Sequence, residues 1–238
     1  MITLAIDTSE ARGSVAILRN GVVVARKVHD NGSDYSGWLL PQVDRSLTEA
    51  SAKMADVDLL AVSTGPGSFT GLRVGLTSVK AWAEVYKKRI VGVSRLEAMA
   101  RLGGHVQSFV ASCYDAQRGQ IFGGLYRNAG RGFERVGDEF VISPDEFVRF
   151  VDREAGREGA TWVTLDPEMI RDTATLQQRI TSGDRIALCP NYLAEIIGAV
   201  AEEKAARSEF SDPVTLDANY VRRSDAEIFW KGSPAGVR

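Results

Sequence analysis

A short apolar segment that runs directly into a glycine-rich turn constrains the fold more than any other feature of the chain. Residues 58–63, Asp-Leu-Leu-Ala-Val-Ser, have the composition of a buried strand. The turn Gly-Pro-Gly-Ser-Phe-Thr-Gly occupies residues 65–71, and a helical pattern begins near Ser68 or Thr70. That pattern ends at the Lys-Lys-Arg of residues 87–89, whose positive charges complement the negative end of the helix dipole. This order predicts an α/β fold with helices packed on a sheet.

The segments on either side extend the same order of elements. We expect strands at 2–6 and 15–28, a helix at 37–54, a strand at 90–94 and a helix at 95–102. Asn20-Gly21 divides the second of these segments into two strands, because this dipeptide favours a type I′ hairpin turn. Pro41 falls near the first turn of its helix, where a missing amide donor costs little. The resulting order, βββαβαβα, predicts a mixed sheet with helices packed against it.

The opening of the chain recurs in its second half. Residues 108–115 are expected to form a strand that ends in Asp115, and residues 119–126 restart a strand. In the same way, Asp7 ends the first strand and residues 13–18 begin the next. This repetition predicts a duplicated unit and hence two lobes.

The length of 238 residues is consistent with two lobes, because it exceeds that of a typical single domain. We assign residues 1–104 to an N-terminal lobe and residues 105–238 to a less regular C-terminal lobe. Prolines separate short elements in the second lobe, and only residues 193–207 predict a clear helix there.

Composition excludes several classes of protein. The net charge of −2 lacks the positive excess of a protein that binds nucleic acid alone, so a role on RNA would require a partner. Cys113 and Cys189 lie outside any Cys-x-x-Cys pattern, which suits a reducing compartment. Residues 1–7 do not resemble a signal peptide, and no run approaches the roughly 20 apolar residues of a membrane span. We therefore expect a cytoplasmic protein that is not in the membrane.

Metal and nucleophile chemistry have little support in the sequence. His29 and His105 are the only histidines, and neither has a second nitrogen or sulfur ligand at a useful spacing. Neither lies in a recognisable Ser-His-Asp context. We expect both histidines on the surface or in loops, and we expect no metal site.

The glycine-rich turn allows two interpretations. Gly65 and Gly67 permit backbone amides to approach an anion, and Ser68 and Thr70 add hydroxyls at the positive end of a helix. The turn is not a P-loop, because Leu72 stands where that motif requires lysine. The other interpretation is a tight turn in which Ser68 or Thr70 caps the helix, and we favour it from the residues alone.

The helix after the turn is apolar over too wide an arc for one sheet contact. Its apolar residues cover roughly 220° at about 100° per residue, whereas a surface helix needs a stripe of about 100°. We therefore expect a protein partner on a second side; packing under a loop or the other lobe is the alternative. The expected partner surface comprises Gly71, Leu72, Gly75, Leu76 and Val79.

Several motifs resemble the TsaB family, also called YeaZ, of tRNA threonylcarbamoyladenosine biosynthesis subunits. The family's landmarks are matched, in order, by Ile6-Asp-Thr-Ser9, Leu39-Leu-Pro41, Gly65-Pro-Gly-Ser-Phe-Thr-Gly-Leu-Arg-Val-Gly75, Gly92-Val-Ser94, Leu96-Glu-Ala98 and Asp115-Ala-Gln-Arg-Gly119. The resemblance is specific through about residue 126. Beyond that point it reduces to Asn219-Tyr-Val-Arg222.

The resemblance implies an actin-like, Hsp70-like (ASKHA) fold of two lobes, the second reduced, with a decayed catalytic apparatus. It implies a non-catalytic scaffold that acts with a TsaD-like catalytic subunit and a TsaE-like ATPase to threonylcarbamoylate adenosine 37 of tRNA (t6A). Such a chain binds no cofactor alone, and ATP and a divalent metal belong to the assembled complex. It meets tRNA only through that complex. Tyr35 stands where family members typically carry a histidine.

Asp7, Thr8 and Ser9 end the first strand, where actin-like phosphotransferases hold a metal-bound phosphate. Local turn hydrogen bonding explains the same residues equally well. Asp115 and Arg118 would face Asp7 across a cleft between the lobes. An autonomous actin-like ATPase or phosphotransferase, using these residues and the glycine-rich turn, is therefore the alternative function; otherwise they are vestigial contacts.

Without its partner the chain is expected to pair with itself through the same apolar helix. A charged residue at Gly75 or Val79 should then give a folded monomer.

Overall fold

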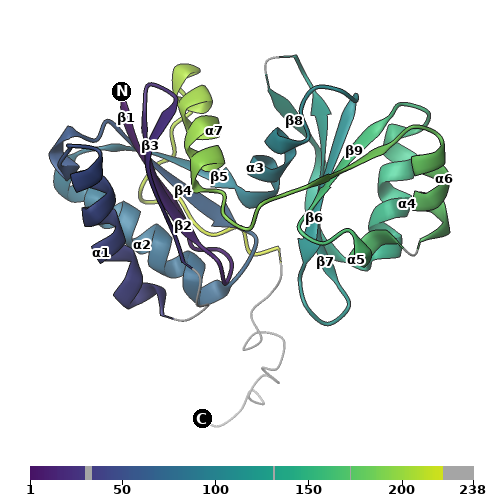
Figure 1. Cartoon of the computed structure of the whole chain (residues 1–238), viewed down its shortest axis with the longest axis horizontal. Coiled ribbons are helices and arrows are strands. Elements are labelled where there is room, and N and C mark those ends of the chain that lie inside the picture. Colours follow the sequence, from purple (N-terminus) through teal and green to yellow (C-terminus); the bar gives the residue numbers. More distant parts are fainter. Residues whose placement is uncertain (30–33, 131, 172, 222–238) are drawn as a thin grey trace, which may run out of the picture.

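The computed structural model describes residues 1–29, 34–130, 132–171 and 173–221. Over these residues the chain forms two five-stranded sheets with helices on their faces (Figure 1). The first half contains the strands β1 (Ile2–Asp7), β2 (Ser14–Arg19), β3 (Val22–Val28), β4 (Leu59–Gly65) and β5 (Arg89–Ser94), the helices α1 (Tyr35–Glu49), α2 (Phe69–Tyr86) and α3 (Arg95–Leu102), and the 3-10 turn η1 (Met54–Asp56). The second half contains the strands β6 (Phe109–Asp115), β7 (Ile121–Asn128), β8 (Phe133–Ile142), β9 (Ala160–Thr164) and β10 (Arg185–Leu188), and the helices α4 (Pro144–Ala155), α5 (Glu168–Arg171), α6 (Ala174–Thr181) and α7 (Ala194–Ala206).

The two sheets share one topology. The strand order is β3-β2-β1-β4-β5 in the first and β8-β7-β6-β9-β10 in the second. In each sheet the first two pairings in this order are antiparallel and the last two are parallel. The structure thus confirms the duplicated unit and the two-lobed actin-like fold that the sequence predicts.

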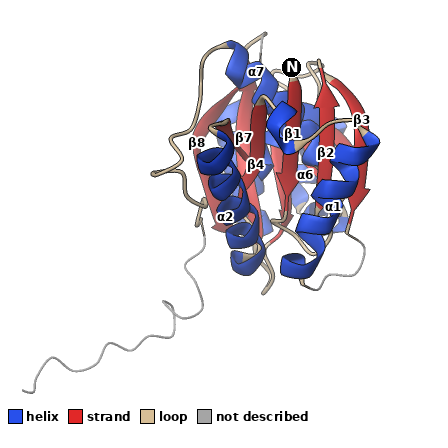
Figure 2. Ribbon diagram, turned by 90° about the vertical axis from the view of Figure 1, so that its left-hand side faces the viewer, coloured by secondary structure: helices blue, strands red, loops and turns tan. Residues whose placement is uncertain are grey.

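Helices cover both faces of the first sheet because its strands are apolar on both faces. Leu4 and Ile6 of β1 point toward α1 and α2, whereas Ala5 points toward α7 on the opposite face. Figure 2 shows α1 and α2 side by side on the outer face. The second sheet has α4, α5 and α6 on its outer face, over a core that includes Phe109 and Trp162.

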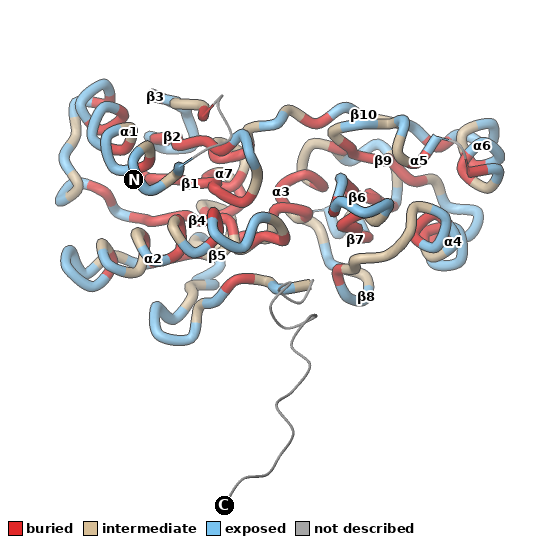
Figure 3. The backbone as a smooth tube through the Cα atoms, turned by 90° about the horizontal axis from the view of Figure 1, so that it is seen from below, coloured by how far each residue is buried: buried red, intermediate tan, exposed pale blue. Residues whose placement is uncertain are grey.

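The inner faces of the two sheets belong to one common core. This core joins Leu18 and Val93 of the first sheet to Val110 and Phe122 of the second. Helices α3 and α7 lie between the sheets, and Figure 3 shows both as mainly buried. Because the core is shared, the lobes are not two independently buried units.

The chain returns to the first lobe after β10. Helix α7 packs on β1 and β2, and Ile90 of β5 pairs with Ser211 in the segment that follows α7. Farther along, the Asn219 amide donates to the Thr64 carbonyl (2.7 Å). The part of the chain from α7 to residue 221 therefore packs on the first sheet, whereas the division at residue 104 assigned it to the C-terminal lobe. Arg222 of the motif that begins at Asn219 lies outside the described residues.

Some elements differ from the sequence-based expectation. Helix α1 ends at Glu49 rather than near Met54, which lies in η1. Helices α4 and α6 were not expected. The Ser143 hydroxyl accepts a hydrogen bond from the Glu146 amide (3.3 Å) and caps α4, so Pro144 begins a helix instead of separating two elements. No helix in the described part of the chain is long and apolar enough to span a membrane.

The start of α2 touches the loop after β1 backbone to backbone. The Thr8 hydroxyl donates to the Gly71 carbonyl (2.7 Å), and a methyl group added at Gly71 would overlap the Thr8 carbonyl oxygen. One turn later, a methyl group at Gly75 would overlap the Thr8 hydroxyl. The two glycines therefore let the helix approach the end of β1 closely.

Replacing Gly71 by alanine is expected to destabilise the protein. In a helix interior alanine is normally favoured over glycine by about 1 kcal/mol. Here the added methyl group meets a backbone oxygen that no rotamer change can move, so we expect a net loss of about 1–3 kcal/mol in the free energy of unfolding. Urea denaturation measures the loss, with Thr77→Ala on the exposed side of the same helix as control. A Gly71→Ala protein as stable as the control would contradict this account of the contact.

Candidate functional site

A cleft of about 610 Å³ opens between the two lobes. Its walls are the loop after β1, the start of α1, the glycine-rich turn, the β6–β7 loop and the segment before the described C-terminal end. The sequence-predicted site residues that line the cleft are Gly67, Ser68, Thr70, Gly71, Asp115 and Arg118. The structure thus brings the glycine-rich turn and the second-lobe pair to one site.

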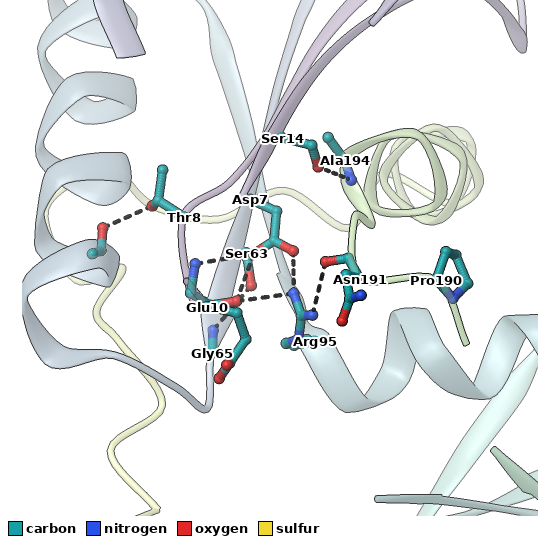
Figure 4. Close-up of polar contacts among 12 residues, drawn as sticks. Asp7, Thr8, Glu10, Ser14, Ser63, Gly65, Arg95, Pro190, Asn191 and Ala194 are labelled. Carbon is teal, nitrogen blue, oxygen red and sulfur yellow. Dashed lines mark hydrogen bonds and ion pairs between the residues drawn. The ribbon is translucent and has the colours of Figure 1, made fainter. Parts of the chain in front are cut away.

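Asp7, Thr8 and Ser9 lie beneath this cleft and are buried. Asp7 is completely buried at the end of β1. Its Oδ1 accepts hydrogen bonds from the Ser9 amide (3.1 Å) and the Ser9 hydroxyl (2.5 Å). Its Oδ2 forms an ion pair with Arg95 Nη1 (Figure 4). Both carboxylate oxygens are therefore engaged by the protein itself.

Arg95, the first residue of α3, is a site residue that sequence reasoning missed. It is completely buried, and its Nη2 donates to the Asn191 carbonyl (3.3 Å). Burial opposes the charge, but the neighbouring Asp7 carboxylate and other groups raise the pKa of Arg95 above its usual value, so it stays protonated. One signal for Arg95 was present in the sequence, because Asp7 and Arg95 each stand at the carboxyl end of an expected strand. Since β1 and β5 both run parallel to β4, these two ends lie at the same edge of the sheet.

The glycine-rich turn is held by local hydrogen bonds. The Ser68 hydroxyl accepts from the Gly71 amide (3.3 Å), which confirms Ser68 as the cap of α2. The Ser68 amide donates to the Ser9 carbonyl (2.7 Å), and the Gly65 amide donates to the Ser63 hydroxyl (3.3 Å). These contacts fix the turn against the loop after β1. Thr70 is exposed in the cleft wall.

The β6–β7 loop has an unusual backbone conformation where it faces the cleft. Gln117, Arg118 and Gly119 have φ values of 66°, 60° and 70°, so three successive residues are left-handed. Asp115 stabilises this turn, because its Oδ1 accepts from the Gln117 amide (2.8 Å) and its Oδ2 from the Gln117 side chain (2.9 Å). Backbone strain of this kind clusters at functional sites, so the loop is a candidate part of the site.

Glu10 adds a carboxyl group to the cleft, and it too was missed in the sequence. Burial raises its pKa from the usual 4.5 to about 7. Arg95 lowers the value, whereas Asp7 and Asp115 raise it. Glu10 therefore titrates near neutral pH at the base of the cleft. Its position next to Asp7-Thr8-Ser9 is the signal that could have found it.

The histidines and Tyr35 do not form a metal centre. His29 was expected on the surface or in a loop; it follows β3 directly and is buried, with ring centroids 4.8 Å from Tyr35 and 4.9 Å from Trp38. The Tyr35 hydroxyl donates to the Glu10 carbonyl. His105 is exposed and bonds to Asn128. Within residues 1–29, 34–130, 132–171 and 173–221, no group of three or more His, Cys, Asp or Glu side chains could hold a metal ion.

The predicted partner surface on α2 requires a correction. Leu72, Leu76 and Val79 are at most 5% exposed and lie in the core under the first sheet. Gly71 and Gly75 face Thr8. All five residues therefore point inward, where they form the intrachain packing that was the alternative. A charged residue at Gly75 or Val79 would disrupt the fold rather than give a folded monomer.

The outward side of α2 carries other apolar residues. Val74 and Trp82 are half-buried, Ala81 is exposed, and Val85 is 70% exposed. At about 100° per residue, Val74, Ala81 and Val85 fall within roughly 40° of one another, opposite the core face. We call Val74, Ser78, Ala81, Trp82 and Val85 the outer stripe of α2. The apolar arc of α2 is thus as wide as the sequence predicts. The apolar residues in excess of those that face the core lie on this outer stripe, not at the five predicted positions.

Replacing Glu10 by glutamine tests the electrostatics of the cleft. Because the folded-state pKa is raised, native Glu10 holds its proton over a pH range in which the unfolded chain has released it. The carboxyl group therefore costs stability as pH rises from about 4.5 to about 7, and the full cost is present above that range. Glu10→Gln should stabilise the protein more at pH 8 than at pH 5, by about 2 kcal/mol. Thermal unfolding of both proteins at the two pH values measures the difference. The exposed Glu49→Gln serves as control, and an equal effect of Glu10→Gln at both values would contradict the assignment.

Comparisons with known proteins agree with this architecture. The family model described as "TsaD: tRNA N6-adenosine threonylcarbamoyltransferase" matches residues 23–230. The chain is 31% identical to the tRNA threonylcarbamoyladenosine biosynthesis protein TsaB of Bacillus subtilis over 233 residues, which cover 97% of this chain and 98% of that relative.

Solved structures give the same result. YeaZ from Pseudomonas aeruginosa superposes with a TM-score of 0.74 and 25% identity, covering 92% of this chain and 99% of that one. A ROK hexokinase from Thermus thermophilus superposes with a TM-score of 0.55 and 10% identity over 87% of this chain and 100% of that one, which shows a shared fold alone. The full-length similarity, the YeaZ-like structure and the motifs around the cleft lead to one conclusion: this chain belongs to the TsaB (YeaZ) family of tRNA threonylcarbamoyladenosine biosynthesis proteins.

Proposed function

We propose that this chain is a non-catalytic subunit in the biosynthesis of threonylcarbamoyladenosine at position 37 of tRNA, where it supports a TsaD-like catalytic subunit. One observation carries the proposal: the outer stripe of α2 exposes Ala81 and Val85 to solvent, while its other apolar members, Val74 and Trp82, are only half-buried against the core. A helix with a complete intrachain core on one side needs no second apolar side for its own stability.

The outer stripe suits contact with a second protein. Ser78 and Ala81 are small, so another helix can approach closely between Val74 and Val85. Helix α1 runs beside α2 on the same face of the first sheet and exposes 55% of Leu40. We infer that this face binds the TsaD-like subunit, and that two copies of the chain pair through it when the partner is absent.

The charge arrangement under the cleft supports a non-catalytic role. An actin-like phosphotransferase needs a carboxylate that is available to a metal-bound phosphate. Here both Asp7 oxygens are used by Ser9 and Arg95. We propose that the chain alone binds no cofactor, and that ATP and a divalent metal act in the assembled complex with a TsaE-like ATPase. Asp7, Thr8, Ser9, Asp115 and Arg118 are then vestigial contacts.

The proposal extends to RNA and to the cellular compartment. A net charge of −2 supplies no general attraction to phosphate, so we propose that tRNA is met through the complex. Cys113 and Cys189 are free and buried, which agrees with the cytoplasmic location expected from the sequence.

Reconstitution tests the role directly. With the TsaD-like and TsaE-like proteins of the same organism, tRNA, ATP and a threonylcarbamoyl donor, omission of this chain should reduce t6A formation at least tenfold. The purified chain alone should not hydrolyse ATP. Mass spectrometry of digested tRNA and phosphate release measure the two quantities. Undiminished t6A without the chain would remove the proposed role, and Mg²⁺-dependent ATP hydrolysis by the chain alone would favour the autonomous ATPase.

Val85→Glu tests the outer stripe without touching the core. Val85 is 70% exposed, so the variant should fold normally, yet a carboxylate in a buried interface should weaken homodimerisation and binding to the TsaD-like subunit at least tenfold. Leu188→Glu is a matched control, because Leu188 is also 70% exposed but lies on β10 in the other lobe. Analytical ultracentrifugation and calorimetry measure the two associations. Equal behaviour of the two variants would rule out the outer stripe as the interface.

A further inference from the structure

The motif that begins at Asn219 has no place in the proposed function, although it lies at the cleft. Asn219 and Tyr220 both line the cleft. They end a segment, residues 208–221, that follows α7 and contains no helix or strand. Figure 1 shows this segment leaving α7 and running along the first lobe toward the middle of the molecule. We call residues 208–221 the strap.

The strap is attached to the first sheet at two points. Near its start, the Ser211 amide donates to the carbonyl of Ile90 on β5 (2.8 Å). Near its end, the Asn219 amide donates to the carbonyl of Thr64 on β4 (2.7 Å). Among the described residues, no backbone hydrogen bond joins residues 212–218 to either sheet. The end at Asn219 can therefore lift while the start stays in place.

Apolar contacts hold the middle of the strap only in part. Ala218 is 9% exposed, and Leu216 is half-buried against the core of the first sheet. Residues 212–215 are exposed, Val214 by 85%. A segment with few buried apolar side chains and few backbone hydrogen bonds opens at a lower free energy than the sheet that carries it. Opening of the strap therefore need not unfold β4 or β5.

The side chain of Asn219 is held by a buried carboxylate from the other lobe. Its amide nitrogen donates to Oε2 of Glu139 on β8, which is 8% exposed. Glu139 Oε1 accepts from the Tyr126 hydroxyl (2.6 Å) and from the Ser94 hydroxyl. All three donors are neutral, so the buried carboxylate depends on these hydrogen bonds. Because only Asn219 belongs to the strap, lifting the strap breaks its bond and leaves the other two in place.

Tyr220 shows what the seated strap does at the cleft. Its ring centroid lies 5.2 Å from that of Phe69, and its hydroxyl accepts a hydrogen bond from Arg73 Nε (3.5 Å). Phe69 and Tyr220 remain 36% and 39% exposed, so this contact lies at the surface. The position of the Tyr220 ring on Phe69 therefore depends on the anchor at the preceding residue, Asn219.

We propose that the strap is a movable wall of the cleft and that Glu139 is its catch, the residue that holds it closed. With Asn219 bound to Glu139, the strap closes one side of the cleft. When that bond breaks, Asn219 and Tyr220 leave the cleft and uncover Phe69, while both sheets stay folded. Glu139 is a positioning residue, because it does not line the cleft. The inference does not rest on the proposed function, because it concerns the isolated chain.

Reversing the hydrogen bond at the catch tests the proposal. In Asn219→Asp, two carboxylates meet where an amide faces a carboxylate, so the strap should lift. Adding Glu139→Gln to the same chain again places a donor opposite an acceptor, so the strap should close. Thr215→Asp is the matched control, because it adds the same charge to the strap at an exposed position.

Hydrogen–deuterium exchange with mass spectrometry follows the strap and the first sheet separately. Asn219→Asp should speed amide exchange in strap peptides by about tenfold or more, while peptides from β4 and β5 stay within about twofold of the native rate. The double variant should return the strap to the native rate, and Thr215→Asp should leave it there.

Three results would overturn the proposal. Unchanged strap exchange in Asn219→Asp would show that this side chain does not hold the strap. Equally faster exchange in β4 and β5 would show that the strap does not move by itself. A double variant as fast as Asn219→Asp would remove Glu139 as the catch. If Asn219→Asp does not fold, Asn219→Ala carries the same expectation, because it removes the donor without adding a charge, and native strap exchange in that variant would count against the catch.

Discussion

The common core between the two sheets is the constraint on which the rest of the molecule depends. Both inner faces are apolar, and α3 and α7 fill the space between them, so neither lobe can bury its inner face without the other. The return of the chain after β10 follows from this requirement, because α7 must come back to cover β1 and β2. The ion pair of Asp7 and Arg95 lies at the polar edge of this core, where strand ends from the first lobe meet β6.

The position of that edge explains why an enzyme-like cleft is present. Parallel strands place their carboxyl ends at one edge, and in this fold the edges of both lobes face one another. The duplicated topology therefore brings Asp115 of the second lobe to the same cleft as the glycine-rich turn. The cleft is a consequence of the fold, and its chemistry depends on which side chains occupy it. Here the carboxylate at the first strand end serves the protein's own arginine.

Much of the architecture was predictable because it depends on local patterns. The hairpin at Asn20-Gly21, the turn before α2 and the repeated strand ending in Asp115 each have a clear local signature, and the structure confirms them. Helix α4 was missed because Pro144 was taken for a breaker, although Ser143 and Glu146 form a capping box around it. Arg95 and Glu10 were missed for another reason: their importance arises from burial beside Asp7, and burial is a property of the assembled lobes.

The error on α2 shows where a helical pattern stops being informative. Periodicity gave the correct conclusion that the helix is apolar on two sides, but it treats both sides alike. What distinguishes them is the close approach of Gly71 and Gly75 to Thr8, which turns the glycine side toward the sheet. Glycines on one side of a helix allow another backbone to approach closely, whether that backbone belongs to a partner or to the same chain. Only the location of the neighbouring strand decides between these two cases. Once that contact is fixed, Ala81 and Val85 face solvent and Val74 stays half-buried beside the core, so the helix retains apolar surface that its own fold covers only in part.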